Sequence, residues 1–389
     1  MRFAFILPID EYYTPVWSGA IATVTRQLVA ELSAEGHKCR VYTPDDGHPV
    51  YTGHPVSRLA FGPAYSRSVA ARKLGSALAR ARRLPRWDYA SYWAAVHRSL
   101  GGSPGDVLVV ANDPVTAARL ARRYPSAQVV LWLHNFLHEA AARALPTLPQ
   151  EVLVVAVSEA VARTTALVSG GTCVPHVIHN GVDTDLFHPP HDDPPGRPLR
   201  VVCHGRIDPN KGQDAAAEAV AQLRAEGLDV ELTVIGEPRT FGFDQASVDE
   251  YASRVQDAVT SAGGRILGWV SHDELAAELR TYDIACALSR VHEPFGLAAL
   301  EAMASGCAVI ATDQGGLPEV VGSAGMIVPA DSPTEVAAAI FALSDPARLR
   351  RVRRSCAERA LIFTWSATAA GLLALVGDAQ LPKDSHTRE

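Results

Sequence analysis

Short, continuously apolar segments alternate with amphipathic segments along most of the chain, and this alternation constrains the fold more than any other feature. In the first half, the apolar segments are separated by helical ones such as residues 20–35, which end at Gly36. Continuous apolar strands alternating with helices indicate a parallel sheet that is covered on both faces. The strands expected in this half are residues 2–7, 39–42, 106–111, 128–133 and 152–157.

A proline-rich segment, residues 189–198, interrupts the alternation, which then starts again. Strands are expected after it at residues 199–204, 231–235, 266–269, 284–288, 308–312 and 326–328. A length of 389 residues suits two domains better than one core. We therefore expect an N-terminal domain (1–188), a linker (189–198) and a C-terminal domain (199–362), with a last helix (363–380) packing back on the first domain.

Composition excludes several classes of protein. A formal net charge of −6 argues against a general nucleic-acid binder, which needs a basic face. The six cysteines are scattered without a CxxC pair, which favours buried thiols in a reducing compartment. The apolar start is too short for a signal peptide, and no run approaches the roughly 20 apolar residues of a membrane span. We expect a cytoplasmic protein, with membrane association open but not favoured.

The strongest functional signal is residues 292–306, HEPFGLAALEAMASG. Pro294 and Gly296 suit a turn that starts a helix, and backbone N–H groups at the start of a helix bind phosphate. Glu293 precedes this helix, where it reaches a group near the ligand. Glu301 lies inside it, in an apolar stretch where an unpaired carboxylate is costly. We expect Glu301 to accept hydrogen bonds from a polyol beside the phosphates, as carboxylates do in dinucleotide-binding folds.

Two glutamates separated by seven residues in this context resemble the signature of glycosyltransferase family 4. Further motifs of that family stand in the expected order at residues 180–183, 205–212, 234–236, 315–319 and 363–365. The resemblance spans nearly the whole chain. It implies an α/β architecture of the GT-B type, in which two Rossmann-like domains face each other across an interdomain cleft. The N-terminal domain would bind the acceptor and the C-terminal domain the nucleotide sugar.

The resemblance also implies the catalytic groups. Arg206 and Lys211 would neutralise the departing nucleoside diphosphate, so that neither a metal nor another cofactor is required. Glu293 and His134 would lie by the transferred sugar. The Asp183-Thr184-Asp185 sequence is interpreted as a turn rather than a metal-binding pair. A zinc site at His134 and His138 is disfavoured, because His134 ends an expected strand and no third ligand is apparent.

Substrate contacts are expected from both halves of the chain. The resemblance implies that the donor contacts backbone or side chains at Gly19, Val270, Phe295, Gly296, Leu297 and Glu301. The family usually has a glycine pair where this chain has only Gly19. Tyr13 and Trp17 are candidates for an aromatic wall that binds the acceptor.

The function expected from these residues is retaining transfer of a sugar from a nucleoside diphosphate donor to a hydroxyl of a small acceptor. A UDP-sugar is the expected donor, and an aminocyclitol or a glycoside of natural-product (antibiotic) biosynthesis is the favoured acceptor. A basic stretch at residues 67–86 keeps open a lipid-linked cell-envelope acceptor at a membrane surface. A nucleotide-sugar epimerase on the same fold is a further alternative. A nicotinamide dehydrogenase is disfavoured, because no intact G-x-G-x-x-G follows the first strand.

Overall fold

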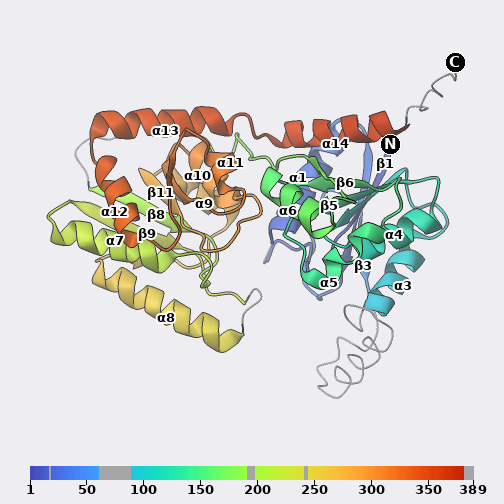
Figure 1. Ribbon diagram of the computed structural model, residues 1–389, viewed down its shortest axis with the longest axis horizontal. Coiled ribbons are helices and arrows are strands. Elements are labelled where there is room, and N and C mark those ends of the chain that lie inside the picture. The colour runs from blue at the N-terminus through green and yellow to red at the C-terminus, as the bar shows by residue number, and fades with distance from the viewer. Residues whose placement is uncertain (17–18, 61–88, 191–197, 241–243, 381–389) are drawn as a thin grey trace. The chain divides into compact units, whose positions relative to one another are not determined.

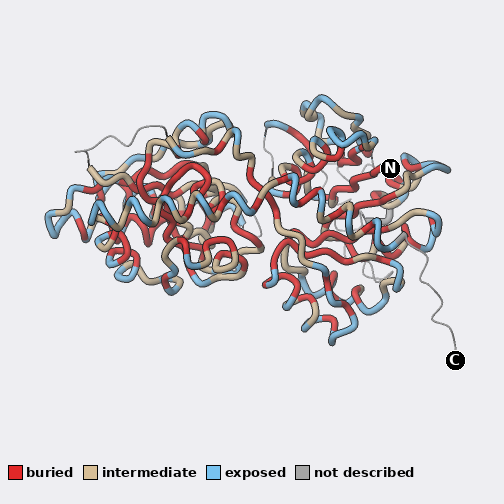
Figure 2. The backbone as a smooth tube through the Cα atoms, turned by 90° about the horizontal axis from the view of Figure 1, so that it is seen from above, coloured by how far each residue is buried: buried red, intermediate tan, exposed pale blue. Residues whose placement is uncertain are grey.

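The computed structural model describes residues 1–16, 19–60, 89–190, 198–240 and 244–380. The chain divides into two compact units (Figure 1). Unit 1 contains Met1–His179 and Trp365–Glu389, and unit 2 contains Asn180–Thr364. Each unit is built on one parallel sheet with helices, and buried residues fill the interior of both units (Figure 2). These two Rossmann-like units confirm the α/β class expected from the alternating pattern.

Unit 1 has a seven-stranded sheet in the order β3-β2-β1-β4-β5-β6-β7. Its strands are β1 Arg2–Ile6, β2 Lys38–Pro44, β3 Val56–Leu59, β4 Val107–Ala111, β5 Gln128–Leu133, β6 Leu153–Ala156 and β7 His176–Val177. Its helices are α1 Ala20–Ala34, α3 Tyr89–Leu100, α4 Pro114–Arg123, α5 Glu139–Ala142, α6 Glu159–Val168 and α14 Trp365–Gln380, with a 3-10 turn at Leu145–Thr147. The central strands β4 and β5 are apolar except for Gln128 at the start of β5, as burial on both faces requires.

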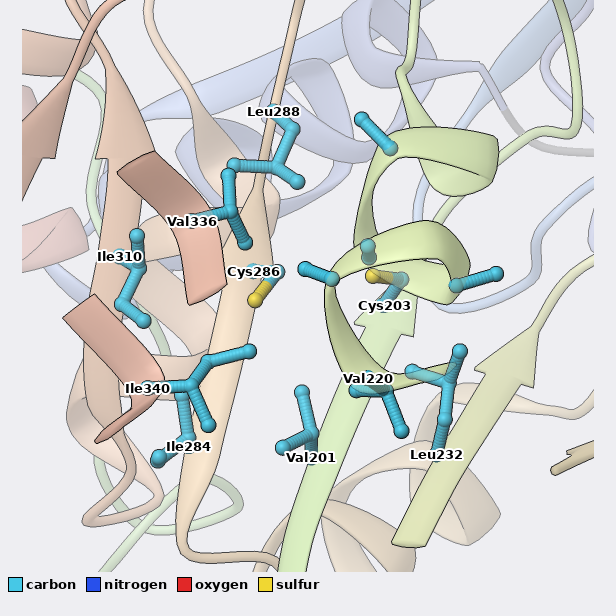
Figure 3. Close-up of a cluster of buried hydrophobic side chains, with 14 of the residues drawn as sticks. Val201, Cys203, Val220, Leu232, Ile284, Cys286, Leu288, Ile310, Val336 and Ile340 are labelled. Atoms are coloured by element: carbon cyan, nitrogen blue, oxygen red, sulfur yellow. The ribbon is translucent and has the colours of Figure 1, made fainter. Parts of the chain in front are cut away.

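Unit 2 has a six-stranded sheet in the order β10-β9-β8-β11-β12-β13. The strands are β8 Leu199–His204, β9 Val230–Ile235, β10 Arg265–Ile266, β11 Ile284–Ala287, β12 Ala308–Thr312 and β13 Met326–Val328. The helices are α7 Gln213–Ala225, α8 Gln245–Ser261, α9 His272–Leu279, α10 Leu297–Ala304, α11 Leu317–Val321, α12 Pro333–Ala342 and α13 Pro346–Ala360. Side chains of β8, β9, β11 and β12 pack against α7 and α12 in the core (Figure 3).

The strand order reverses beside β8, because β9 lies on one side of it and β11 on the other. In open α/β sheets, ligands bind outside the carboxyl ends of the strands at such a reversal. The loops that leave β8 and β11 here are residues 205–212 and 288–296. Unit 2 therefore directs these two loops, which contain Arg206, Lys211, Glu293, Phe295 and Gly296, to the same edge of its sheet.

The structure departs from the expected elements at the edges of both sheets. Strands β3 and β7 were not expected, and β10 ends at Ile266 instead of continuing to Trp269. Gly268 follows with a φ of +73°, in the left-handed region, which is incompatible with an extended strand. Edge strands are short and carry few apolar residues, so the pattern of the sequence marks them weakly.

The division between the units also lies elsewhere than expected. Residues 180–188 belong to unit 2, where the Val182 N–H donates to the Phe363 carbonyl at 2.9 Å. The boundary therefore follows His179, and most of the segment interpreted as a linker, residues 191–197, lies outside the described residues. Helix α14 belongs to unit 1, in which it packs on α1, and the Thr368 hydroxyl donates to the His179 carbonyl at 2.8 Å.

All six cysteines are unpaired and buried, as their apolar surroundings indicated. Among the described residues, no helix combines the length and the apolar character needed to cross a bilayer. The basic stretch at residues 67–86 lies outside the described residues.

Candidate functional site

The loop that follows β8 is held against the end of β11. At Gly212 the backbone has a φ of +67°, and an added Cβ would lie 2.3 Å from the Leu288 carbonyl oxygen. Only glycine tolerates this combination of left-handed backbone and close approach. The Arg290 N–H also donates to the Asn210 carbonyl at 2.8 Å. The two loops at the reversal of the sheet are thus packed together through their backbones.

These loops bring Lys211 and Glu293 into contact. The Lys211 ammonium lies 2.7 Å from the Glu293 carboxylate, which also accepts a hydrogen bond from the Ser289 hydroxyl at 2.9 Å. The two side chains retain 24% and 21% of their exposure, so the pair is accessible to a ligand. Burial alone raises the pKa of Glu293, but Lys211, Ser289 and the nearby Arg206 outweigh it and lower the pKa. The carboxylate is therefore ionised in the pair.

Arg206 completes this cluster. Its charge acts on Glu293, and its guanidinium lies 3.5 Å from the buried Asp208 carboxylate. Asp208 also accepts the Asn210 N–H at 2.9 Å, which fixes the turn between the two cations. The structure thus brings together Arg206, Lys211 and Glu293. Two positive side chains projecting from one loop suit a diphosphate.

The backbone of Glu293 is fixed from the opposite side by two glycines. The Gly316 N–H donates to the Glu293 carbonyl at 2.7 Å. Gly315 has a φ of +62°, and an added Cβ would lie 2.1 Å from the same carbonyl oxygen. The glycine pair therefore serves close packing of backbone on backbone within unit 2.

The helix that follows Glu293 presents its N-terminus at the same place. Helix α10 begins at Leu297 after Gly296, whose φ is +109°, and no side chain of the described residues caps it. Backbone N–H groups of a first helical turn and the helix dipole together favour an anion. Phe295 is buried and packs edge-on against Phe363, with ring centroids 6.0 Å apart. Its side chain is thus part of the core, and only its backbone is suited to contact a ligand.

Glu301 lies one turn further along α10, and both of its carboxylate oxygens are engaged. His204 Nε2 lies 3.4 Å from Oε2, and His272 Nε2 lies 3.2 Å from Oε1. Burial alone raises the pKa of Glu301, but the two histidines outweigh it and lower the pKa to about 2. An ionised carboxylate only accepts hydrogen bonds, so both imidazoles donate from Nε2.

Val270 lies two residues before His272 in the chain. It is half-buried and directly precedes Ser271, the N-cap of α9, whose side chain forms a capping box with Glu274. The first residue of α9 is His272. The segment at Val270, which is expected to contact the donor, therefore leads directly to one of the two imidazoles on Glu301.

His134 follows β5 in unit 1 and differs from the charged residues of unit 2. Its side chain is 9% exposed, and Nδ1 has no hydrogen-bond partner among the described residues. Burial lowers the pKa of His134 to about 3, so the imidazole is neutral near pH 7. Its orientation comes from its neighbours: Asn112 Oδ1 accepts the backbone N–H groups of His134 and Asn135 at 2.7 and 3.2 Å. A neutral imidazole can donate a hydrogen bond but cannot supply the positive charge that steadies an anion.

Neither of the two sequences that imitate metal sites gathers ligands in the structure. His138 Nδ1 accepts the Ala141 N–H at 3.2 Å at the start of α5. Asp183 accepts the N–H groups of Asp185 and Leu186, both at 3.1 Å, and so stabilises a turn. In the part of the chain that the structure describes, no three His, Cys, Asp or Glu side chains form a group that could hold a metal ion.

The remaining unit 1 candidates have diverse surroundings. Gly19 is the N-cap of α1, and the Glu11 carboxylate already accepts the Ala22 N–H of the first turn at 3.0 Å. Tyr13 is only 1% exposed, and its hydroxyl lies 2.6 Å from His54 Nε2. Tyr13 thus presents almost no surface to an acceptor, which corrects its placement in an aromatic wall. Trp17 lies outside the described residues.

Sequence reasoning missed several polar residues that contact the candidates, among them Asn112, His204, His272 and Ser289. Asn112 follows β4 directly, His204 is the last residue of β8, and Ser289 lies two residues beyond β11. A polar residue at the carboxyl end of a buried strand is a usable signal, because such ends line ligand sites in parallel sheets. His272 has no comparable signal, since nothing local relates it to Glu301.

Two protein-family models match the chain. The model described as Glycosyltransferase Family 4 matches residues 21–186, and the model described as Glycosyl transferases group 1 matches residues 198–345. The first match lies in unit 1 except for residues 180–186, and the second lies in unit 2.

Curated relatives match either half or nearly all of the chain. An MMP alpha-(1->4)-mannosyltransferase of Mycolicibacterium hassiacum is 36% identical over 51% of this chain and 47% of the relative. A D-inositol 3-phosphate glycosyltransferase of Corynebacterium glutamicum is 35% identical over 52% of this chain and 51% of the relative. A phosphatidyl-myo-inositol mannosyltransferase of Mycolicibacterium smegmatis is 28% identical over 96% of this chain and 92% of the relative. The chain thus spans about half the length of the first two relatives.

Solved structures share the arrangement of both sheets. A sucrose-phosphate synthase of Thermosynechococcus elongatus has a TM-score of 0.78 at 22% identity, with 97% of this chain and 98% of that chain covered. HepE of Anabaena in complex with UDP-glucose has a TM-score of 0.72 at 18% identity, with 97% and 100% covered. At these identities the likeness shows the fold alone.

Proposed function

The chain belongs to glycosyltransferase family 4 and has the GT-B fold, and on that premise we propose that it transfers a hexose from a nucleoside diphosphate sugar to a hydroxyl group. The observation that carries this proposal is the cluster of Arg206, Lys211 and Glu293 at the N-terminus of α10. The cluster offers two cations and a helix dipole to one anion, which is what a departing nucleoside diphosphate requires.

Electrostatic stabilisation of the leaving group is the main chemical step that these residues support. When the bond from the sugar to the diphosphate breaks, negative charge develops on the phosphate oxygen that leaves. Lys211 has three ammonium protons and donates one of them to Glu293, so further protons remain for that oxygen. Because the Lys211–Glu293 pair is already formed, little reorganisation is needed at the moment of reaction. We propose that no metal ion takes part.

We propose that the anomeric configuration is retained through attack from the side of the leaving group. The acceptor oxygen bonds to the anomeric carbon while the bond to the phosphate oxygen breaks, and that oxygen takes the acceptor's proton. Glu293 is assigned no role as a covalent nucleophile: Lys211 and Ser289 both donate to its Oε2, and Oε1 is proposed to accept a hydrogen bond from the substrate. Its proposed task is to hold Lys211 and to accept a hydroxyl of the transferred sugar.

His134 is proposed to donate a hydrogen bond to the transferred sugar without bearing charge. Its pKa of about 3 keeps it neutral throughout the working range of pH. Asn112 fixes the backbone on which the imidazole sits, so the ring presents its N–H in a defined direction.

The relatives guide the choice of substrates to be tested. Two of the three are named as mannosyltransferases, and two act on inositol-containing acceptors according to their names. We therefore propose a nucleoside diphosphate mannose as donor and a cyclitol of the inositol type, free, phosphorylated or lipid-linked, as acceptor. The UDP-sugar and aminocyclitol expected from the sequence are the competing pair, and one structural neighbour is in complex with UDP-glucose.

The first experiment measures the melting temperature of the protein with GDP, UDP, ADP and dTDP, each with and without EDTA. A ligand that binds only the folded state raises the melting temperature. We expect one nucleoside diphosphate to act specifically, with an effect that EDTA leaves unchanged. Stabilisation that EDTA abolishes, or no response to any of the four, would contradict the proposed donor site.

The second experiment tests transfer itself. The donor with the preferred base is incubated with inositol, inositol 3-phosphate and phosphatidylinositol vesicles, and products are detected by mass. The anomeric configuration of the product is then read by NMR. Lys211→Ala should abolish most product, whereas Lys38→Ala, which removes an exposed lysine from β2, should leave the yield unchanged. Release of the free nucleoside diphosphate in the absence of any acceptor would favour the epimerase alternative.

A further inference from the structure

Glu301 is the one carboxylate among the candidate residues whose two oxygens each contact a different imidazole. His204 approaches Oε2 at 3.4 Å and His272 approaches Oε1 at 3.2 Å. The three residues come from three elements: the end of β8, the start of α9 and the second turn of α10. A carboxylate held at both oxygens by groups from separate elements cannot rotate about its last bond without losing one of the two contacts.

The two imidazoles differ in how they are held. The His204 side chain is 6% exposed, whereas that of His272 is 37% exposed. His272 packs edge-on against the buried Phe187, with ring centroids 5.7 Å apart. Backbone capping also fixes its position, because it is the first residue of α9 after the Ser271 capping box. Both donors are therefore placed by the fold rather than by Glu301 alone.

The arrangement leaves room for a ligand on the same carboxylate. Each carboxylate oxygen has about two lone-pair positions, and each imidazole uses one of them. One position on each oxygen is left, and the Glu301 side chain retains 14% exposure. Two neighbouring hydroxyl groups, such as the 2′ and 3′ hydroxyls of a ribose, match two acceptor positions on one carboxylate.

We propose that His204 and His272 are positioning residues that orient the Glu301 carboxylate to accept the ribose diol of a nucleoside diphosphate, and so set the preference for ribonucleotides. The inference rests on the proposed function, because it assumes that unit 2 binds a nucleotide. It goes further by assigning a specificity role to two histidines outside the signature motif. Neither histidine touches the reacting atoms in this scheme.

The test measures dissociation constants by calorimetry for the stabilising nucleoside diphosphate and for its 2′,3′-dideoxy analogue. We expect the unaltered protein to prefer the ribonucleotide by about 10- to 100-fold, the range for a site that loses hydrogen bonds to a missing hydroxyl pair. His204→Ala and His272→Ala should each lower this preference by about fivefold or more. Affinity for the dideoxy analogue should change by less than about threefold, because that ligand does not use Glu301.

Conservative variants separate positioning from a general structural effect. A glutamine amide can donate from a place close to that of histidine Nε2, so His204→Gln and His272→Gln should regain most of the preference. Glu301→Gln should remove the preference, and His176→Ala, an exposed histidine of β7 in unit 1, should leave it intact. Circular dichroism and melting temperature show whether each variant is folded. Where an alanine variant does not fold, the glutamine variant at the same position still tests the inference.

The outcomes distinguish this inference from the proposed function. If no nucleoside diphosphate binds to the unaltered protein, the proposed function fails and the inference fails with it. If nucleotides bind and all four histidine variants keep the full preference for the ribonucleotide, only the inference is overturned. Equal losses of affinity for both ligands would also overturn it, since that pattern indicates damage to the site as a whole.

Discussion

The candidate residues of unit 2 are paired with one another, whereas the main candidate of unit 1 has an unpaired side-chain nitrogen. In unit 2, Lys211 contacts Glu293, and Glu301 contacts two histidines. In unit 1, His134 Nδ1 has no hydrogen-bond partner among the described residues, and burial keeps the ring neutral. The difference indicates two ways to prepare a site before the ligand arrives. Unit 2 has its charges fixed in place, while unit 1 has a polar group fixed through its backbone.

The largest effect is expected from substitutions that disrupt the charged cluster of Arg206, Lys211 and Glu293 in unit 2. Lys211→Ala should lower kcat by roughly 10²–10³, the usual scale for losing one group that stabilises a developing negative charge. Glu293→Gln should lower kcat as well, and the double variant should be less impaired than the two single effects predict together. Residues that act as one unit give such non-additive effects. The measurement is steady-state kinetics with the donor identified by melting temperature.

Lys38→Ala is the matched control, because it removes a lysine that none of the candidate residues contacts in the described structure. Strictly additive losses for Lys211 and Glu293 would show that the two side chains act independently. That result would remove the contrast between a paired unit 2 and an unpaired unit 1.

The next effect tests whether close backbone packing holds the Glu293 loop. In Gly315→Ala, the new Cβ would lie 2.1 Å from the Glu293 carbonyl oxygen and the backbone would keep a φ of +62°. We expect a loss of about 2–3 kcal/mol in the free energy of unfolding, combining left-handed strain with displacement of the loop. Urea denaturation of Gly315→Ala and of the unaltered protein measures this loss in the free energy of unfolding.

Gly227→Ala supplies the comparison, since Gly227 has a φ of +93° and an added Cβ there meets nothing within 4 Å. The free energy of unfolding of Gly227→Ala should fall only by the cost of left-handed backbone strain, about 1–2 kcal/mol. The turnover number should fall with Gly315→Ala and stay unchanged with Gly227→Ala. If both variants behave alike, the loop is not held by the glycine pair.

The sequence predicts the centre of each unit much better than its edges. The central strands are buried on both faces and are therefore continuous apolar runs, as in β4 and β5, where every residue but Gln128 is apolar. Strand β3 contains Ser57 and Arg58, and β7 has only two residues. Their pairing depends on the neighbouring strand, and a local pattern contains no information about that neighbour.

The same distinction holds for the candidate sites. Lys211 and Glu293 stand in local motifs, so the sequence identifies them, although it does not state that they touch. His204 and His272 meet on Glu301 only because β8, α9 and α10 converge in the fold. Tyr13 was misplaced for a related reason: an aromatic residue in a loop suits either a binding wall or a core, and contacts with Tyr51 and His54 place it in the core.

The third prediction contrasts the pH dependence of stability in the two units. The pKa of His134 is about 3 in the folded state, against 6.5 for an ordinary histidine. Between these two values the unfolded chain binds a proton that the folded chain does not, so stability falls as the pH decreases from 6.5 towards 3. From pH 7 to pH 5 this amounts to about 2 kcal/mol, at about 1.4 kcal/mol for each pH unit below 6.5.

Replacing the histidine should remove this loss. His134→Gln should be less sensitive than the unaltered protein between pH 7 and pH 5, as measured by urea denaturation across that range. Glu301 acts in the same direction but in a lower pH range: its pKa of about 2 lies below the ordinary value of 4.5, so the stability that it contributes is present above pH 4.5 and is lost only below it. A variant with unchanged acid sensitivity between pH 7 and pH 5 would refute the view that His134 is buried and neutral.

The smallest expected effect concerns the residue that orients His134. Asn112 has a φ of +55°, and its Oδ1 accepts two backbone N–H groups at the end of β5. Asn112→Asp keeps an acceptor in the same place and should change stability and kcat little. Asn112→Gly suits the left-handed backbone but removes the acceptor, so we expect a loss of about 1 kcal/mol in the free energy of unfolding. It should also lower kcat several-fold, because the imidazole loses its fixed direction.

Asn112→Ala adds the strain of a left-handed backbone to the same loss and should be the least stable of the three. The decisive quantity is the order of kcat among these variants. If kcat follows the presence of the acceptor, with aspartate above both glycine and alanine, the hydrogen bonds to the backbone orient His134. If glycine matches aspartate, backbone conformation alone is sufficient, and unit 1 prepares its site without the side chain of Asn112. In that case the contrast with unit 2 becomes sharper, because only unit 2 would depend on side chains that hold one another.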